Sequence, residues 1–103
     1  MSLNLHLLRL FATVVKAGSF SRAADTLHIS QPAISKGVRD FELQVGCRLL
    51  DRTPRGVRPT REGQALIRHA EALFAAERAA ADELQSLRSL DSATRGDGDA
   101  VEE

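Results

Sequence analysis

The sequence predicts a mainly α-helical fold with a small two-stranded wing and a long carboxy-terminal helix. Three observations lead to this expectation. The 103 residues are 43% hydrophobic but only 4% aromatic, which suits helices rich in Ala and Leu better than a β-sandwich. Apolar residues recur at steps of three and four through most of the chain. Glycine and proline gather in residues 46–59, between two such helical stretches.

The first 17 residues predict an amphipathic helix that ends at Gly18. Its inner stripe consists of Leu5, Leu8, Phe11, Ala12 and Val15. A short second helix follows, and we expect Ser21 to cap it because a serine hydroxyl can accept a hydrogen bond from a free backbone N–H. The inner face of this helix is formed by Ala23, Ala24 and Leu27.

A third helix is predicted from Gln31 to about Val45. Ser30 can cap it, and Pro32 falls in its first turn, where the missing N–H costs nothing. Its inner face is predicted to consist of Ile34, Val38, Phe41 and Val45. The polar residues on its other faces are therefore free to meet a partner.

Two short extended segments around a turn are predicted after Gly46. They cover residues 49–52 and 57–59, with the turn at 53–56. The segments form a small wing, which is basic because it carries Arg52, Arg55 and Arg58.

The last helix is predicted to follow Thr60, which can cap it while Glu62 occupies its first turn. It contains no helix breaker up to Leu90, which gives about 30 residues and about 45 Å. An apolar seam along it alternates steps of four and three as in a coiled coil. The seam consists of Leu66, Ala70, Leu73, Ala80, Leu84 and Leu87, with Phe74 beside it and Glu77 as its polar member.

So long a helix cannot bury its far half on a small domain, and we expect the seam to pair with a second copy of the chain. From Asp91 onward the residues are polar and without periodicity. This segment predicts a disordered acidic tail or a truncated linker. The expected organisation is a domain over residues 1–60, a dimerisation helix over 61–90 and a tail over 91–103.

Charge is distributed unevenly, although the formal net charge is zero. Residues 1–30 carry three basic and one acidic residue, and residues 31–70 carry eight and four, whereas residues 71–103 carry three and nine. A basic front and an acidic rear indicate a surface for a polyanion such as DNA.

Two short helices joined by a turn over residues 27–30 match the helix-turn-helix pattern. Small side chains at Ala23 and Ala24 let the two helices cross closely. His28 lies in the turn, where many such motifs have glycine. The helix that follows begins with Gln31 and Pro32, and its first turn can enter the major groove of DNA.

The stretch from Leu8 to Gly63 contains F-A-T-V-V-K-A-G-S-F-S-R-A-A-D-T-L-H-I-S-Q-P-A-I-S-K, then F-E, V-G, R-L-L-D-R and R-P-T-R-E-G. In these motifs and their spacing it resembles the amino-terminal winged-helix domain of LysR-type transcriptional regulators. The resemblance implies sequence-specific binding of a double-stranded DNA operator, an interrupted palindrome of the T-N11-A type. It also implies a homodimer through the linker helix. An effector ligand would bind only in a carboxy-terminal domain absent from these residues, so we expect the chain to be a DNA-binding fragment.

The resemblance places the recognition residues at the start of the third helix. They are Gln31, Pro32, Ala33, Ser35 and Lys36. An amide can pair with an adenine edge, Pro and Ala can contact a thymine methyl group, and a lysine can reach guanine or a phosphate. Phosphate contacts are expected from Ser19, Ser21, Ser30 and Arg39, and the wing residues Arg52, Arg55 and Arg58 are expected along the backbone or in the adjacent minor groove.

At Gly37 the sequence departs from the family, which usually has a long polar residue there. Glycine inside a helix costs about 1 kcal/mol relative to alanine unless close packing offsets the loss.

Other functions find little support in the sequence. There is no paired nucleophile and base, carboxylate pair, phosphate loop or metal-ligand spacing, so we expect neither an enzyme nor a bound cofactor or metal. Cys47 has no second cysteine to pair with, and no apolar run reaches the roughly 18 residues that span a bilayer. We therefore expect a cytoplasmic protein that does not enter a membrane. The remaining alternative is an interaction module that uses the winged helix as a scaffold.

Overall fold

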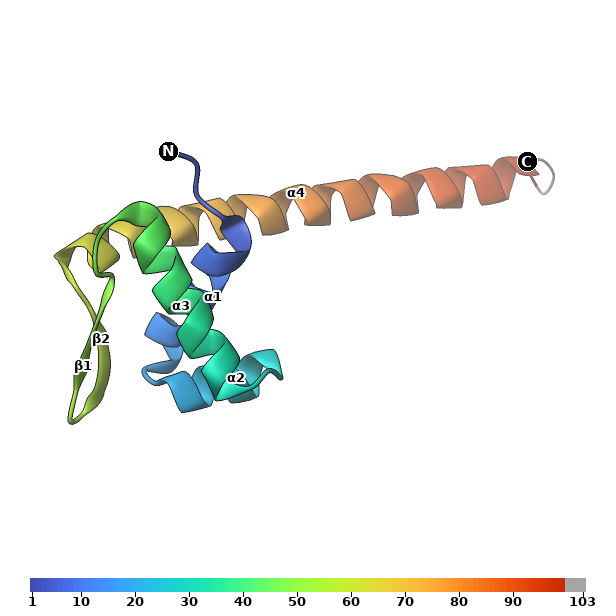
Figure 1. The fold of residues 1–103 in the computed structure, drawn as a ribbon. Helices are drawn as coiled ribbons and strands as arrows, with labels where there is room; N and C mark the ends of the chain where they lie inside the picture. The colour runs from blue at the N-terminus through green and yellow to red at the C-terminus, as the bar shows by residue number, and fades with distance from the viewer. Residues whose placement is uncertain (100–103) are drawn as a thin grey trace. The chain divides into compact units, whose positions relative to one another are not determined.

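A computed structural model describes the backbone of residues 1–99 and the side chains of residues 1–91. The elements, in chain order, are α1 (Leu5–Ala17), α2 (Phe20–Leu27), α3 (Gln31–Val45), β1 (Leu50–Thr53), β2 (Gly56–Pro59) and α4 (Arg61–Asp99) (Figure 1). The mainly helical fold with a two-stranded wing is therefore confirmed. The chain divides into two compact units, residues 1–70 and residues 71–103, so the boundary lies within α4.

Helix α1 begins and ends with local caps. The Asn4 side chain accepts a hydrogen bond from the Leu7 N–H, and Gly18, the residue at which the helix is predicted to end, adopts the left-handed conformation. Its buried residues are Leu8, Leu10, Phe11 and Val14. The predicted stripe is therefore partly wrong, since Leu5 is 55% exposed and Leu10 is buried. Because α1 packs against both α2 and α3, its buried face is wider than a single stripe.

Helix α2 begins earlier than the sequence suggests. The Ser19 hydroxyl accepts a 3.1 Å hydrogen bond from the Arg22 N–H, so Ser19 is the N-cap and the prediction of Ser21 is wrong. The physical reason is Phe20, which is buried as the first residue of the helix and leaves the cap to the residue before it. At the other end His28 takes a left-handed φ of 58°, where glycine would be the easier choice.

Helix α3 confirms the predicted bounds and caps. The Ser30 hydroxyl accepts from the Ala33 N–H, Pro32 lies in the first turn, and Gly46 closes the helix. Its buried side contains Ile34, Gly37, Val38 and Phe41, whereas Val45 is half-buried.

The centre of the first unit is the contact between α1 and α3. The rings of Phe11 and Phe41 lie 6.2 Å apart, and both side chains are fully buried. A Cβ atom at Gly37 would come within 2.5 Å of the Leu10 Cδ1 atom. Gly37 thus permits close packing of the two helices, which gives the glycine a structural reason.

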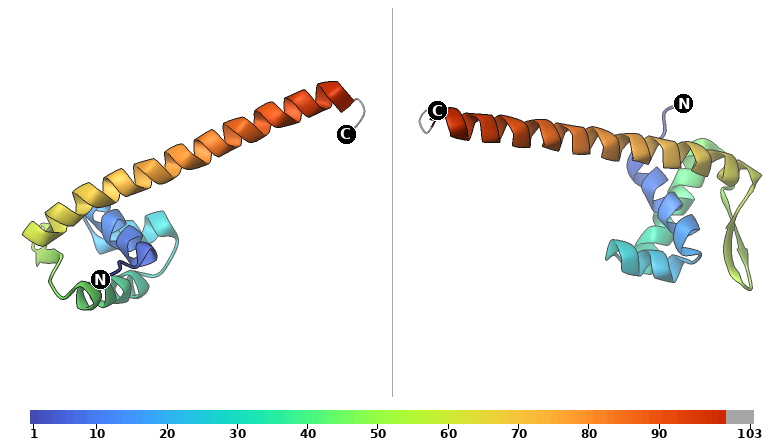
Figure 2. Two further views of the ribbon diagram at one scale, coloured as in Figure 1. Left: turned by 90° about the horizontal axis from the view of Figure 1, so that it is seen from above. Right: turned by 180° about the vertical axis from the view of Figure 1, so that it is seen from behind.

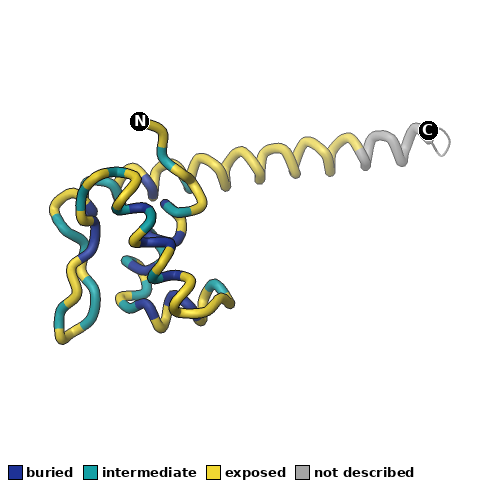
Figure 3. The backbone as a smooth tube through the Cα atoms, viewed as in Figure 1, coloured by how far each residue is buried: buried dark blue, intermediate teal, exposed yellow. Residues whose placement is uncertain are grey.

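The wing is the predicted antiparallel pair. β1 and β2 pair in the register Leu50 with Pro59 through Thr53 with Gly56. Figure 3 shows buried segments (dark blue) along α1, α2 and α3 and at the start of β1.

Helix α4 begins as predicted, since the Thr60 hydroxyl accepts from the Gly63 N–H and Glu62 lies in the first turn. It is one continuous helix (Figure 2) and continues to Asp99, whereas the sequence predicts an end near Leu90 and a tail from Asp91. Residues 91–95 contain neither glycine nor proline, and extending an existing helix costs far less than starting one. The tail predicted over residues 100–103 lies outside the described residues. Among the described helices, none has an apolar stretch that could cross a bilayer.

Candidate nucleic-acid interface

The first turn of α3 presents a polar surface. Gln31, Pro32 and Ala33 are all exposed, and Ser35 one turn later is half-buried. The exposure follows from the helix pattern, because Ile34 and Val38 occupy the opposite face and are buried in the core. All the predicted recognition residues can therefore be reached by a ligand, with Ser35 the least accessible of them.

Lys36 is exposed but paired. Its Nζ atom lies 2.8 Å from Oδ2 of Asp40, one turn further along α3, and both side chains are well exposed to solvent. A pair of this kind on a helix surface stabilises the fold by only about 0.3–0.5 kcal/mol. Lys36 can therefore exchange Asp40 for a stronger anionic partner at little cost.

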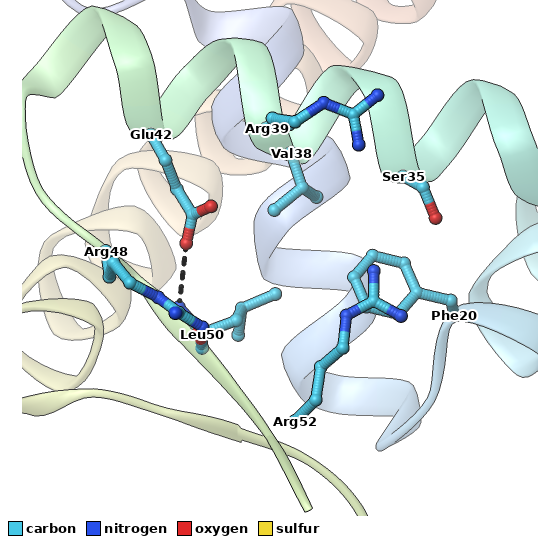
Figure 4. A pocket seen from close by; sticks show the side chains of 8 residues that line it. All are labelled: Phe20, Ser35, Val38, Arg39, Glu42, Arg48, Leu50 and Arg52. Carbon is cyan, nitrogen blue, oxygen red and sulfur yellow. Dashed lines mark hydrogen bonds between the residues drawn. The ribbon is translucent and has the colours of Figure 1, made fainter.

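The wing arginines differ in their freedom. Arg55 lies in the turn between β1 and β2, Arg58 lies in β2, and both side chains are exposed. The guanidinium carbon of Arg52 instead lies 4.4 Å from the centre of the Phe20 ring, a cation–π contact (Figure 4). Arg52 is thus held in one direction, whereas the other two can adjust to what they bind.

Two anchors hold the wing against the helices. Glu42 of α3 accepts hydrogen bonds at Oε2 from the backbone N–H groups of Leu49, at 2.7 Å, and of Leu50, at 3.1 Å. Figure 4 shows the hydrogen bond with Leu50. In β2, the Val57 N–H donates to the carbonyl of Gly18 at 3.2 Å. The wing is therefore fixed both to α3 and to the turn between α1 and α2.

Gly56 makes the second anchor possible. Its φ is +126°, and a Cβ atom at this position would lie 2.8 Å from the Gly18 carbonyl oxygen. The turn itself is stiffened by Thr53, whose hydroxyl donates to the Gly56 carbonyl and accepts from the Arg55 N–H. The backbone around Arg55 is thus ordered before any ligand arrives.

The sequence does not reveal the roles of Glu42, which makes the first anchor, and of Phe20, which holds Arg52. Glu42 belongs to the F-E motif, and Phe20 lies just before the predicted cap Ser21, but neither position indicates a long-range contact. Of the serines expected at phosphates, Ser19 and Ser30 accept backbone hydrogen bonds as caps, and Ser21 is exposed. A capping hydroxyl still has its own hydrogen to donate, so the caps remain compatible with phosphate contacts.

The predicted dimerisation residues fall into three groups by exposure. Ala70 is 0% exposed and belongs to the first unit, so it has no surface to offer a second chain and its assignment to the dimer seam is wrong. Leu66 and Phe74 are half-buried. The remaining seam residues are exposed, and they are Leu73, Ala80, Leu84 and Leu87. In the described chain a row of large apolar side chains is therefore left uncovered.

Over the residues that the structure describes, no three His, Cys, Asp or Glu side chains are grouped so that they could hold a metal ion. Cys47 is half-buried and free. The exposed side chains at the start of α3 and on the wing include the amide of Gln31, the ammonium group of Lys36 and the guanidinium groups of Arg55 and Arg58.

Comparison with known proteins agrees with this arrangement. Residues 5–64 match the family described as bacterial regulatory helix-turn-helix protein, lysR family. The chain is 39% identical over 89 residues to the SDS degradation transcriptional activation protein of a Pseudomonas species, covering 86% of this chain and 29% of that protein. It is 44% identical over 75 residues to the HTH-type transcriptional regulator PcaQ of Agrobacterium fabrum, covering 73% and 24%. The chain thus spans less than a third of the length of these relatives.

Solved structures with the same fold include complexes with DNA. The crystal structure of the BenM DBD/catB site 1 DNA complex is 33% identical with a TM-score of 0.78, covering 84% of this chain and 97% of that one. The crystal structure of the CbnR DBD–DNA complex is 29% identical with a TM-score of 0.72, covering 84% and 99%. In both cases nearly the whole neighbour is matched.

Proposed function

This chain belongs to the lysR family of bacterial regulatory helix-turn-helix proteins, and from that membership we propose how it reads DNA. It is the DNA-binding domain of a transcriptional regulator and not an enzyme. We propose that the first turn of α3 enters the major groove, while the wing lies along the sugar–phosphate backbone or in the adjacent minor groove. A bacterial protein with this role works in the cytoplasm, where the chromosome lies.

The observation that carries the proposal is the combination of an exposed recognition turn with an anchored basic wing. Gln31, Pro32 and Ala33 are open to a base edge, and the wing that carries Arg55 and Arg58 is tied to α3 through Glu42. Rigid placement of the two contact regions lowers the entropy cost of binding. The basic excess of residues 31–70 supplies the attraction to phosphates.

We further propose that two copies associate through α4 and read two half-sites. The uncovered leucines of the seam support this, because so many exposed large apolar side chains on one helix favour a partner. Two-fold symmetry of the dimer would place two copies of α3 in major grooves on one face of the duplex, one or two helical turns apart. The operator would then be an interrupted palindrome of the T-N11-A type.

The relatives are about three times as long as this chain, which supports placing effector binding in a further domain. An effector ligand would then contact a part of the regulator outside these 103 residues.

Selection from a pool of random duplexes tests the proposal. We expect the protein to enrich a sequence with two symmetric halves. On that sequence, Gln31→Ala should relax the preference at one base pair in each half, whereas Arg55→Gln should weaken every duplex alike and flatten the salt dependence. A pool that stays random after several rounds would contradict sequence-specific binding. Equal losses of affinity from both variants on all duplexes would contradict the division of roles.

A further inference from the structure

A pocket of about 210 Å³ lies between the recognition helix α3 and strand β1 of the wing. Three elements contribute apolar surface to its walls, through Phe20 of α2, Val38 of α3 and Leu50 of β1. Its polar groups are Ser35, Arg39, Glu42, Arg48 and Arg52. Three guanidinium groups against one carboxylate make this a cationic pocket.

Two of the three arginines are directed at the same space from opposite sides. Figure 4 shows the guanidinium group of Arg39 on α3 and that of Arg52 on β1 facing an opening that the Ser35 hydroxyl also borders. The contact with Phe20 holds Arg52 in this direction at 4.4 Å from the ring centre. Arg52 thus reaches toward α3 (Figure 4).

The other two charged groups of the pocket are already engaged. The Arg48 Nη2 atom donates to the Leu50 carbonyl at 3.0 Å and lies 3.7 Å from Oδ1 of Asp51. The Glu42 carboxylate accepts from the backbone of Leu49 and Leu50 at the same oxygen. Arg39 and Arg52 therefore provide the charge that a ligand in the pocket would meet.

We propose that Arg39 and Arg52 grip a single phosphate of the DNA backbone between them, with the Ser35 hydroxyl as a third donor. Guanidinium groups bind phosphate oxygens through paired N–H donors, and two of them at one phosphate also fix its position. The inference rests on the proposed function and deepens it. It assigns Arg52 to a phosphate instead of the minor groove, and it couples the recognition helix to the wing through the bound DNA.

The test is the salt dependence of DNA affinity in a double-mutant cycle. Each phosphate contact adds about −0.9 to the slope of log K against log salt concentration. If Arg39 and Arg52 share one phosphate, the double variant R39Q/R52Q should lose about 0.9 of slope for each bound protomer, or about 1.8 for the proposed dimer, and the two single losses of affinity should not multiply. A loss of about 1.8 for each bound protomer, with multiplying affinities, would mean two separate phosphates and would overturn the proposal. So would unchanged DNA binding in the double variant.

Arg48→Gln is the matched control, because Arg48 lines the same pocket but is held by Leu50 and Asp51. It should leave both the slope and the affinity unchanged, and a loss of slope equal to that of R39Q/R52Q would overturn the assignment of the two gripping arginines. Thermal melts show whether each variant folds. If Arg52→Gln unfolds, Arg52→Lys replaces it: affinity should fall while the slope stays, because the charge remains and the planar fork is lost.

Inorganic phosphate distinguishes a DNA phosphate from a free anion. In a titration followed by NMR of the arginine Nε–H groups, we expect phosphate to shift Arg39 and Arg52 and duplex DNA to displace it. Phosphate that stays bound when DNA binds would make the pocket a site for a small anion and would overturn the DNA assignment. If the unaltered protein binds no duplex at low salt, the proposed function fails as a whole. If it binds DNA but the cycle is additive, only the shared phosphate fails.

Discussion

The carboxylate of Glu42 lies 2.7 Å from the backbone nitrogen of Leu49 and joins the recognition helix to the wing. The same oxygen also accepts from the Leu50 N–H, so one side chain satisfies two successive donors where the chain enters β1. Hydrogen bonds to an ionised acceptor are stronger than neutral ones. Glu42 therefore sets where the wing begins relative to α3.

Replacing Glu42 should destabilise the domain. Glu42→Ala leaves two part-buried N–H groups without their acceptor, and we expect a loss of about 2 kcal/mol in the free energy of unfolding. Glu42→Gln keeps a neutral acceptor and should lose about half as much. Urea denaturation measures both, with the exposed Glu71→Gln as control. The error of such fits is roughly 0.5 kcal/mol. If the free energy of unfolding of Glu42→Ala differs from that of the unaltered protein by less than this, the anchor is unimportant for stability.

Two glycines inside helices should respond differently to alanine. A Cβ atom at Gly63 would collide with the backbone carbonyl of Leu49, and we expect Gly63→Ala to lose about 2–3 kcal/mol of stability despite its better helix propensity. At Gly37 the neighbour is the tip of the Leu10 side chain, which can rotate. The free energy of unfolding of Gly37→Ala should therefore lie within about 1 kcal/mol of that of the unaltered protein. Thermal unfolding of the two variants is the measurement. If Gly63→Ala proves as stable as Gly37→Ala, the start of α4 can move away from Leu49 to make room for the Cβ atom.

Neutralising Asp40 should strengthen DNA binding. Asp40→Asn releases Lys36 from its 2.8 Å pair and removes a negative charge from the recognition helix. We expect about 3- to 10-fold tighter binding at low salt, fading as salt rises, with little change in stability. Asp82→Asn in α4 gives the same change in net charge as a control. If Asp40→Asn strengthens DNA binding just as much in a protein that also carries Lys36→Gln, release of Lys36 is not the cause of the tighter binding.

A charge in the seam of α4 should separate the proposed dimer. Leu84 is 59% exposed in the single chain, and Leu84→Glu would place a carboxylate against its twin in a paired seam. We expect dissociation to shift to at least about tenfold higher protein concentration, which corresponds to 1.4 kcal/mol. Sedimentation equilibrium measures it, with Gln85→Glu as the neighbouring control outside the seam. If Leu84→Glu weakens the dimer no more than Gln85→Glu does, the two chains must associate through another surface.

Local chemistry made much of the fold predictable. Ser30, Pro32 and Thr60 act within one helical turn of their own positions, so the sequence around them is enough to place the starts of α3 and α4. The same is true of Gly18 and Gly46, whose left-handed backbone ends a helix.

What the sequence could not predict depends on contacts between distant segments. The hydrophobic pattern of α1 does not predict that Leu10 is buried. Its burial depends on the position of α3, where Gly37 packs against the Leu10 side chain. The stacking of Arg52 on Phe20 joins residues 32 positions apart, and the direction of this arginine follows only from the fold. Ser19 and Ser21 are equivalent as capping residues, and the burial of Phe20 decides between them. The wing anchors are long-range contacts of the same kind.

The most direct test of DNA reading is a fluorescence-anisotropy titration of a T-N11-A duplex and a scrambled duplex at two salt concentrations, with the mass of the protein measured by light scattering. We expect a dimer that binds the palindrome more tightly than the scrambled duplex, with both affinities falling as salt rises. Equal affinity for the two duplexes would contradict reading of this operator type. No binding to either duplex at low salt would contradict DNA binding itself and leave the winged helix as a scaffold for protein partners.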